Sequence, residues 1–276
     1  MKKNILKVFV CLLTLSLLFT GCAKKEEPTT AEPKENEAVT LTIGATPVPH
    51  TEILEFIKPK LEKEGIQLEI KEFTDYVTPN LALAEKEIDA NFFQHLPYLE
   101  TFNKERGLDL VSAVNVHVEP LGLYSKKIKS LDALENGSTI TIPNDPTNGG
   151  RALILLDTKG IIKLKEDAGL EATEKDIDKN PKNLVFKPID AAQLPRTLDD
   201  VDASVINTNF ALEGGLNPKE DALLIEGSES PYANIVTVRP EDKDSEKIQK
   251  LIKILQSEDV KKFIEKKYNG AIVPAF

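Results

Sequence analysis

Cysteine is almost absent from this chain. The two that occur, Cys11 and Cys22, both lie at the N-terminal end, so the rest of the chain has no thiol for catalysis or metal binding and no disulfide. The chain also lacks the G-x-S-x-G, P-loop and H-E-x-x-H patterns of common enzyme classes. His50, His95 and His117 are its only histidines, and no two of them have the i, i+4 spacing of a zinc-binding helix. We therefore expect neither an enzyme nor a resident metal or cofactor.

Positive charge is also in short supply. The chain has 35 basic against 45 acidic residues, a formal net charge of −10. This excess opposes a general attraction to phosphate backbones, so nucleic acid is not an expected partner. A chain of 276 residues that is 41% hydrophobic can nevertheless bury a large core, either in one domain or in two α/β lobes.

The N-terminus has the pattern of a secretory signal. Lysines at positions 2, 3 and 7 precede an apolar run over 8–19 that is short for a membrane span. Phe19, Thr20 and Gly21 then lead to Cys22, which resembles a bacterial lipoprotein processing site. We expect a signal peptide at 1–21 and a lipidated Cys22, carrying palmitate, that anchors the protein outside the cytoplasm. Ordinary cleavage, with Cys22 a bystander, is the alternative. Residues 22–38 read as a flexible tether, because they are polar and lack an apolar period.

The body alternates strand and helix patterns, which is typical of βαβ units in an α/β fold. A helical pattern over 53–61 ends before Gly65, and Pro59 is expected to kink or split it. Another helix is expected to start near Gly149, and a closing helix covers 248–255. We expect one lobe at 39–124, a second at 125–231, and a return to the first at 232–276. The expected strands include 41–43, 66–70, 88–93, 111–118, 121–124, 139–142, 184–186, 203–206 and 232–238.

The segment 143–151 joins one of these strands to an apolar helix, a place where α/β sheets commonly bind ligands. Asn148 is a suitable N-cap, and free N–H groups at a helix start attract anions. Arg151 can hold a carboxylate through two parallel hydrogen bonds. The alternative is a capped turn with Arg151 in solvent.

Polar residues alternate with valines along the strand at 111–118. Asn115, His117 and Glu119 consequently share one face, which is either solvated or turned toward a ligand.

Aromatic residues gather around the end of the preceding strand. Tyr76, Phe92, Phe93, His95 and Tyr98 could all belong to the core. Aromatic rings also attract a thioether sulfur by about 0.3–1.5 kcal/mol per contact, so an aromatic slot would suit a methionine side chain.

Six segments together resemble the NlpA-type methionine-binding lipoproteins, in the same order along the chain. They lie at 75–80, 89–99, 117–125, 143–153, 193–196 and 230–235, so the resemblance extends over nearly the whole mature body.

The resemblance implies a two-lobed periplasmic-binding-protein fold that closes on L-methionine and delivers it to the permease and ATPase of an ABC importer. By similarity, the side-chain pocket would contain Tyr76, Phe93, His95, His117 and Tyr124. Arg151 would take the carboxylate, and the remaining polar shell would be Asn148, Asn207 or Asn209, and Asn234. Relatives also bind either enantiomer or a methionine-containing dipeptide. The alternatives are therefore a binding protein for such a dipeptide or another apolar amino acid, or a metal-binding lipoprotein that uses the histidines with Glu119.

Overall fold

The computed structural model describes residues 39–227 and 231–276. The expected signal peptide, the lipidation site Cys22 and the tether lie outside the described residues. Within the described ranges, no helix combines the length and apolarity that crossing a bilayer requires.

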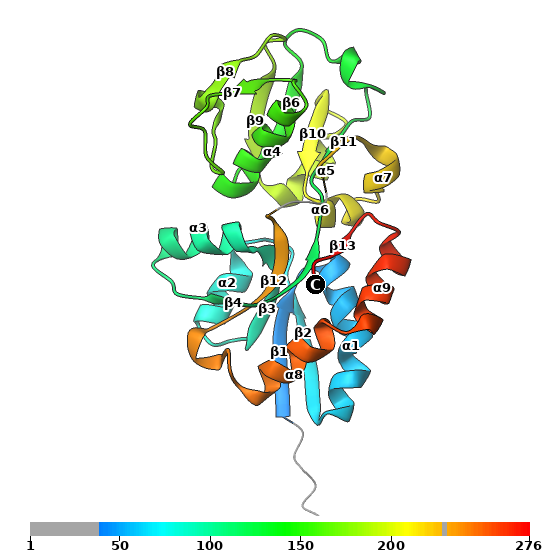
Figure 1. Cartoon of the computed structure of the whole chain (residues 1–276). Helices are drawn as coiled ribbons and strands as arrows, with labels where there is room; N and C mark the ends of the chain where they lie inside the picture. The colour runs from blue at the N-terminus through cyan, green and yellow to red at the C-terminus, as the bar shows by residue number, and fades with distance from the viewer. Residues whose placement is uncertain (1–38, 228–230) are drawn as a thin grey trace, which may run out of the picture. The chain divides into compact units, whose positions relative to one another are not determined.

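The first lobe is built on a six-stranded mixed sheet in the order β13-β4-β12-β3-β1-β2. Its central strands β1 and β3 run parallel, and β12 returns late in the chain to pair antiparallel with both β3 and β4 (Figure 1). The strands are β1 (Val39–Ala45), β2 (Ile66–Glu72), β3 (Ala90–His95), β4 (Val111–Val118), β12 (Ala233–Val238) and β13 (Val273–Pro274). The helices are α1 (Glu52–Lys63), α2 (Thr78–Ala84), α3 (Leu96–Arg106), α8 (Glu246–Leu255) and α9 (Glu258–Tyr268), with short turns η1 (Pro47–Thr51) and η5 (Pro240–Asp242).

The second lobe is built on a five-stranded mixed sheet in the order β11-β5-β10-β6-β9. Its strands are β5 (Gly122–Tyr124), β6 (Thr139–Pro143), β9 (Val185–Ile189), β10 (Ala203–Ile206) and β11 (Ala222–Ile225). The helices are α4 (Pro146–Thr158), α5 (Leu194–Thr197), α6 (Thr208–Glu213) and α7 (Pro218–Asp221). A small hairpin, β7 (Lys163–Leu164) with β8 (Ile177–Lys179), and the turns η2 (Leu131–Ala133), η3 (Glu174–Asp176) and η4 (Ala191–Gln193) complete it.

Each sheet has its own apolar core. In the first lobe, α1, α8 and α9 cover one face with buried side chains such as Ile57, Leu251 and Ile264. The other face lies under α2 and α3, where Leu83 and Leu99 pack. Because consecutive strand residues point to opposite faces, neighbouring positions of β3 serve different layers: Phe92 lies in the first core and Phe93 in the aromatic cluster opposite it. In the second lobe, α4 covers the sheet through its apolar face.

The strand β5 belongs to the second sheet, because it pairs antiparallel with β10 and β11. The expected end of the first lobe at residue 124 is therefore a few residues too late. Alternation along the chain shows that 121–124 is a strand, but not which sheet it joins. The chain passes between the sheets twice, from β4 to β5 and from β11 to β12.

The structure departs from two local expectations. Of the kink or split expected at Pro59, the split does not occur, because α1 runs through this residue. The N-cap of α4 is Asp145 rather than Asn148, and its carboxylate accepts the Asn148 N–H at 2.9 Å. The helix starts earlier than expected because Pro146 suits its first turn, and this moves Asn148 inside the helix.

Candidate functional site

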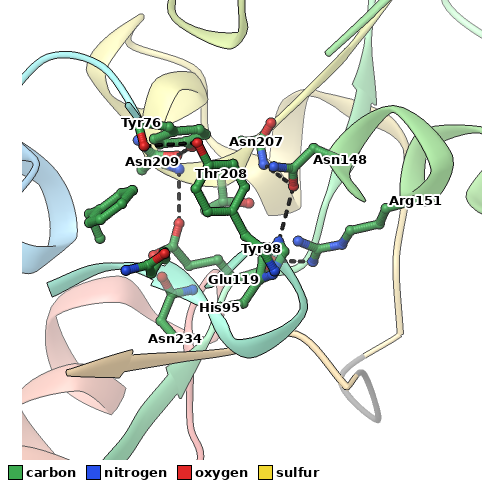
Figure 2. Close-up of a pocket in the computed structure, with 12 residues that line it drawn as sticks. Tyr76, His95, Tyr98, Glu119, Asn148, Arg151, Asn207, Thr208, Asn209 and Asn234 are labelled. Atoms are coloured by element: carbon green, nitrogen blue, oxygen red, sulfur yellow. Dashed lines mark hydrogen bonds between the residues drawn. The ribbon is translucent and has the colours of Figure 1, made fainter. Parts of the chain in front are cut away.

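Side chains from both lobes line one small cavity (Figure 2). The first lobe contributes residues from the end of β3, from α3, from β12 and from the segments next to α2 and β4, and the second lobe contributes residues from α4 and the start of α6. The lining residues are Tyr76, Phe93, Gln94, His95, Tyr98, Glu119, Asn148, Arg151, Asn207, Thr208, Asn209 and Asn234.

One wall of the cavity is aromatic. Tyr76, Phe93 and Tyr98 form a triangle with ring centroids 5.9 to 6.1 Å apart. The hydroxyl groups of the two tyrosines already have hydrogen-bond partners. Tyr98 donates to the Tyr76 carbonyl at 2.8 Å, and Tyr76 donates to Asn209 Oδ1 at 2.5 Å. The wall therefore offers ring faces and edges, which suit an aliphatic or thioether group.

His95 is neutral and has a fixed tautomer. Its Nδ1 accepts the Tyr98 N–H at 3.1 Å, so Nε2 carries the proton and donates to Asn148 Oδ1 at 3.2 Å. Burial, together with the nearby charge of Arg151, lowers the pKa of His95 to about 3. Asn148 also accepts a hydrogen bond from Asn207 at 2.9 Å, which links these three polar side chains across the cavity.

Arg151 is 3% exposed and is held by an ion pair within its own lobe. Its Nε donates to Glu226 Oε1 at 3.1 Å and its Nη2 to Glu226 Oε2 at 2.5 Å. Nη2 also donates to the Glu119 carbonyl at 2.8 Å, and the guanidinium carbon lies 4.2 Å from the Tyr232 ring centroid. These hydrogen bonds use Nε and Nη2, which leaves Nη1 as the guanidinium nitrogen available to an incoming anion.

Two side-chain amide atoms in the lining are buried without a partner among the described residues. They are Oδ1 of Asn207, an acceptor, and Nδ2 of Asn209, a donor. A buried polar group without a hydrogen bond costs about 1–3 kcal/mol. Since both residues line the cavity, a ligand with polar groups of its own would satisfy them. Asn207 and Asn209, between which the sequence leaves the choice open, both line the cavity.

The described residues contain one trio with the spacing of metal ligands, His50, His117 and Glu119, whose ligand atoms lie within 4.8 Å of one another. The facing atoms are already engaged with one another or with Asn234. Glu119 Oε1 is hydrogen-bonded to Nε2 of His117 at 2.7 Å and lies 3.2 Å from Nε2 of His50, which is itself hydrogen-bonded to Asn234 Oδ1 at 3.0 Å. We therefore interpret the trio as a hydrogen-bonded cluster. His95 lies outside it, so the three histidines do not form a common site.

Most of the residues expected at the site line the cavity: Tyr76, Phe93, His95, Asn148, Arg151, Asn207, Asn209 and Asn234. His117 does not, because it lies behind Glu119. Nor does Tyr124, which packs in an apolar cluster of the second lobe with Leu194 and Phe210. This follows from β5 joining the second sheet, which turns the Tyr124 ring into that cluster.

Four lining residues, Gln94, Tyr98, Glu119 and Thr208, are absent from the expected set. Tyr98 and Glu119 stand out in the sequence as part of an aromatic group and a polar face, but pattern alone does not separate ligand contacts from core. Gln94 lies between Phe93 and His95, and Thr208 between two asparagines, so position next to expected contacts was the only available signal. The Gln94 amide is used within its own lobe, where its nitrogen donates to Asn80 at 2.6 Å.

Comparisons with known proteins agree on one family. The family described as NlpA lipoprotein matches residues 41–276. The D-methionine-binding lipoprotein MetQ of Escherichia coli K12 is 47% identical over 77% of this chain and 79% of its own length. Outer membrane lipoprotein 3 of Mannheimia haemolytica is 42% identical over 98% of both chains. A solved structure of a nutrient binding protein from Burkholderia cenocepacia bound to methionine is 48% identical, covers 86% of this chain and 100% of its own, and has a TM-score of 0.83.

Proposed function

Because this chain belongs to the NlpA lipoprotein family, we propose that it captures methionine outside the cytoplasm and delivers it to an ABC importer. Relatives named as methionine-binding lipoproteins support the ligand, and a relative described as an ABC transporter periplasmic substrate-binding protein supports the role in import. The observation that carries the proposal is the cavity itself, whose lining combines an aromatic wall, the Arg151 side chain and two buried amide atoms, Asn207 Oδ1 and Asn209 Nδ2, that lack a partner among the described residues. An amino acid with an apolar, sulfur-containing side chain complements all three features.

We propose that binding acts by population shift. A ligand that touches Tyr76 and His95 from one lobe and Arg151 and Asn207 from the other gains its full contacts only when the lobes are closed. Its differential affinity then favours the closed form, which is the form that would dock on the permease. The hinge would lie at the two crossings between sheets, so the lobes would comprise residues 39–121 with β12 onward, and β5 through β11. No bond is made or broken in this cycle.

The test is calorimetric titration of a soluble form that begins at Ala23, after unfolding and refolding to remove carried ligand. We expect tight one-to-one binding of methionine. L-methionine, D-methionine and glycyl-methionine are titrated in parallel, and mass spectrometry identifies any ligand released from the protein as purified. Binding of the dipeptide with no heat from either enantiomer would replace methionine by the dipeptide as the ligand. Absence of binding by all three would overturn the proposal.

We also propose that Cys22 is the lipidated first residue of the mature protein. Replacing Cys22 with serine should move the protein from the membrane fraction to the secreted fraction, because serine has no thiol to carry the lipid. Fractionation and labelling with a palmitate analogue measure this, and Cys11→Ser is the matched control because Cys11 lies inside the signal peptide. A Cys22→Ser protein that stays membrane-bound would contradict the assignment.

A further inference from the structure

Behind the cavity, two buried histidines converge on one carboxylate oxygen. Oε1 of Glu119 lies 2.7 Å from Nε2 of His117 and 3.2 Å from Nε2 of His50. Both histidines have no exposed surface, and Glu119 is 6% exposed. Neither histidine lines the cavity, whereas Glu119 does. His50 and His117 therefore contact Glu119, a lining residue, from the side that faces away from the cavity.

The hydrogen-bond partners fix the protons on both rings. Oγ1 of Thr46 lies 2.7 Å from Nδ1 of His50, while Nε2 of His50 lies 3.0 Å from Oδ1 of Asn234, which can only accept. His50 consequently carries its proton on Nε2 and donates it to Asn234, while the same nitrogen lies 3.2 Å from Glu119 Oε1. Nδ1 of His117 has no partner among the described residues, so the proton of His117 also lies on Nε2, facing Glu119. Burial lowers the pKa of His50 to about 4 and that of His117 to about 3, which leaves both rings neutral donors.

The other oxygen of Glu119 is also held in place. Oε2 accepts the backbone N–H of Asn209 at 3.1 Å, across the two lobes. The carboxylate thus receives hydrogen bonds on both oxygens from groups that only donate to it, an arrangement that favours the anion. Figure 2 shows Glu119 and Arg151 approaching the site from different sides. The Arg151 ion pair is with Glu226 rather than with the Glu119 carboxylate, on which Arg151 acts only through its charge.

We infer that His50 and His117 are positioning residues that hold the Glu119 carboxylate anionic and directed into the cavity, where it accepts the ammonium group of the ligand. This inference rests on the proposed capture of an amino acid. The carboxylate and ammonium groups of the ligand would be recognised separately, by Arg151 and by Glu119.

The charged and titratable groups around Glu119 determine how binding depends on pH. They come from η1, β4, α4, α6, α9 and the segment before α2, and are His50, His117, Arg151, Glu213, Tyr268 and Tyr76. Burial raises the pKa of Glu119, and His50, Arg151 and the Asn209 N–H oppose this. Ammonium binding requires the anion, so affinity is retained above the pKa of Glu119 in the empty protein and is lost as the pH falls through it. Removing a donor from the carboxylate would raise that pKa and move the loss of affinity to higher pH.

The first experiment compares methionine with 4-(methylsulfanyl)butanoate, which is methionine without its amino group, on the soluble form and on Glu119→Gln. The unmodified protein should prefer methionine by about 100-fold, and Glu119→Gln should reduce this preference below about tenfold. Equal weakening of both ligands in Glu119→Gln would overturn the inference while leaving the proposed function intact. Failure of the unmodified protein to bind methionine would instead overturn the proposed function.

The second experiment measures methionine affinity from pH 5 to 8 for His117→Leu and His117→Gln. Glutamine can place an N–H close to the position of Nε2 and leucine cannot, so the acid loss of affinity should move up by about one pH unit in His117→Leu and stay in place in His117→Gln. Glu213→Gln is the comparison of opposite sign. Partial desolvation and the charges of Glu119 and Glu72 raise the pKa of Glu213 to about 7, so removing this neighbouring negative charge should move the acid loss of affinity to lower pH. A uniform loss at every pH in His117→Leu would overturn the positioning role. If His117→Leu does not fold, the inference is tested by the analogue comparison on Glu119→Gln and by the pH dependence of methionine affinity in His50→Leu.

Discussion

Replacing Arg151 with alanine is expected to weaken methionine binding by about 100-fold or more. Truncating one partner of a buried, hydrogen-bonded charge pair costs about 2–5 kcal/mol, and about 1.4 kcal/mol corresponds to a factor of ten. Arg151 is 3% exposed and supplies the one cationic group among the residues described as lining the cavity. The ligand carboxylate would lose its donor, and calorimetric titration of the soluble form measures the loss.

Two further variants separate lost ligand contact from lost structure. Arg151→Ala also leaves Glu226, with a side chain 16% exposed, without its ion-pair partner. The double variant Arg151→Ala, Glu226→Gln should recover thermal stability but not binding. Arg151→Lys keeps the charge but cannot pair with Glu226 and the ligand in the same planar geometry, so it should bind at an intermediate level. Near-normal affinity of Arg151→Ala would show that the carboxylate is held elsewhere, with Asn148 and Asn207 the next residues to test.

Replacing Phe92 with alanine is expected to lower the free energy of unfolding by about 3–5 kcal/mol. Phe92 is completely buried in the core of the first lobe. Its ring lies 4.6 Å from that of His50 and 5.4 Å from that of His117, centroid to centroid, so the cavity left by truncation would lie directly beneath the histidine pair. Urea denaturation of the soluble form, monitored by one probe in each lobe, measures this change in the free energy of unfolding.

The matched control is Phe92→Leu, which keeps most of the buried volume and should cost distinctly less than the alanine variant. Methionine affinity should fall in parallel with stability in Phe92→Ala, because the histidines that support Glu119 lose a packing partner. A loss of stability below about 1 kcal/mol would mean that the lobe relaxes to fill the space.

Secondary structure and several site residues could be read from the sequence because their signals are local. The strands β4 and β10 have the expected bounds, since a short run of alternating or continuous apolar residues specifies them. Arg151 lies near the start of a helix after a strand, and Phe93 and His95 lie at the end of another, where the carboxyl ends of strands meet a cleft. For these residues, the position along a strand or helix was sufficient to predict that they lie at the site.

Tertiary structure alone decided the pairings between distant segments. Glu226 lies 75 residues from Arg151, yet it neutralises that residue. His50 meets Asn234 over a separation of 184 residues, and Asn209 reaches Glu119 over 90. Tyr124 does not line the cavity as expected, because its strand pairs within the second sheet. Such contacts depend on where the chain crosses between lobes, and a hydrophobic pattern carries no information about which sheet edge a strand will pair with. The sequence by itself therefore determined the family, the elements and the polar and aromatic groups available at the site, whereas the crossings between the two sheets decided which of those groups face the ligand and which hold them in place.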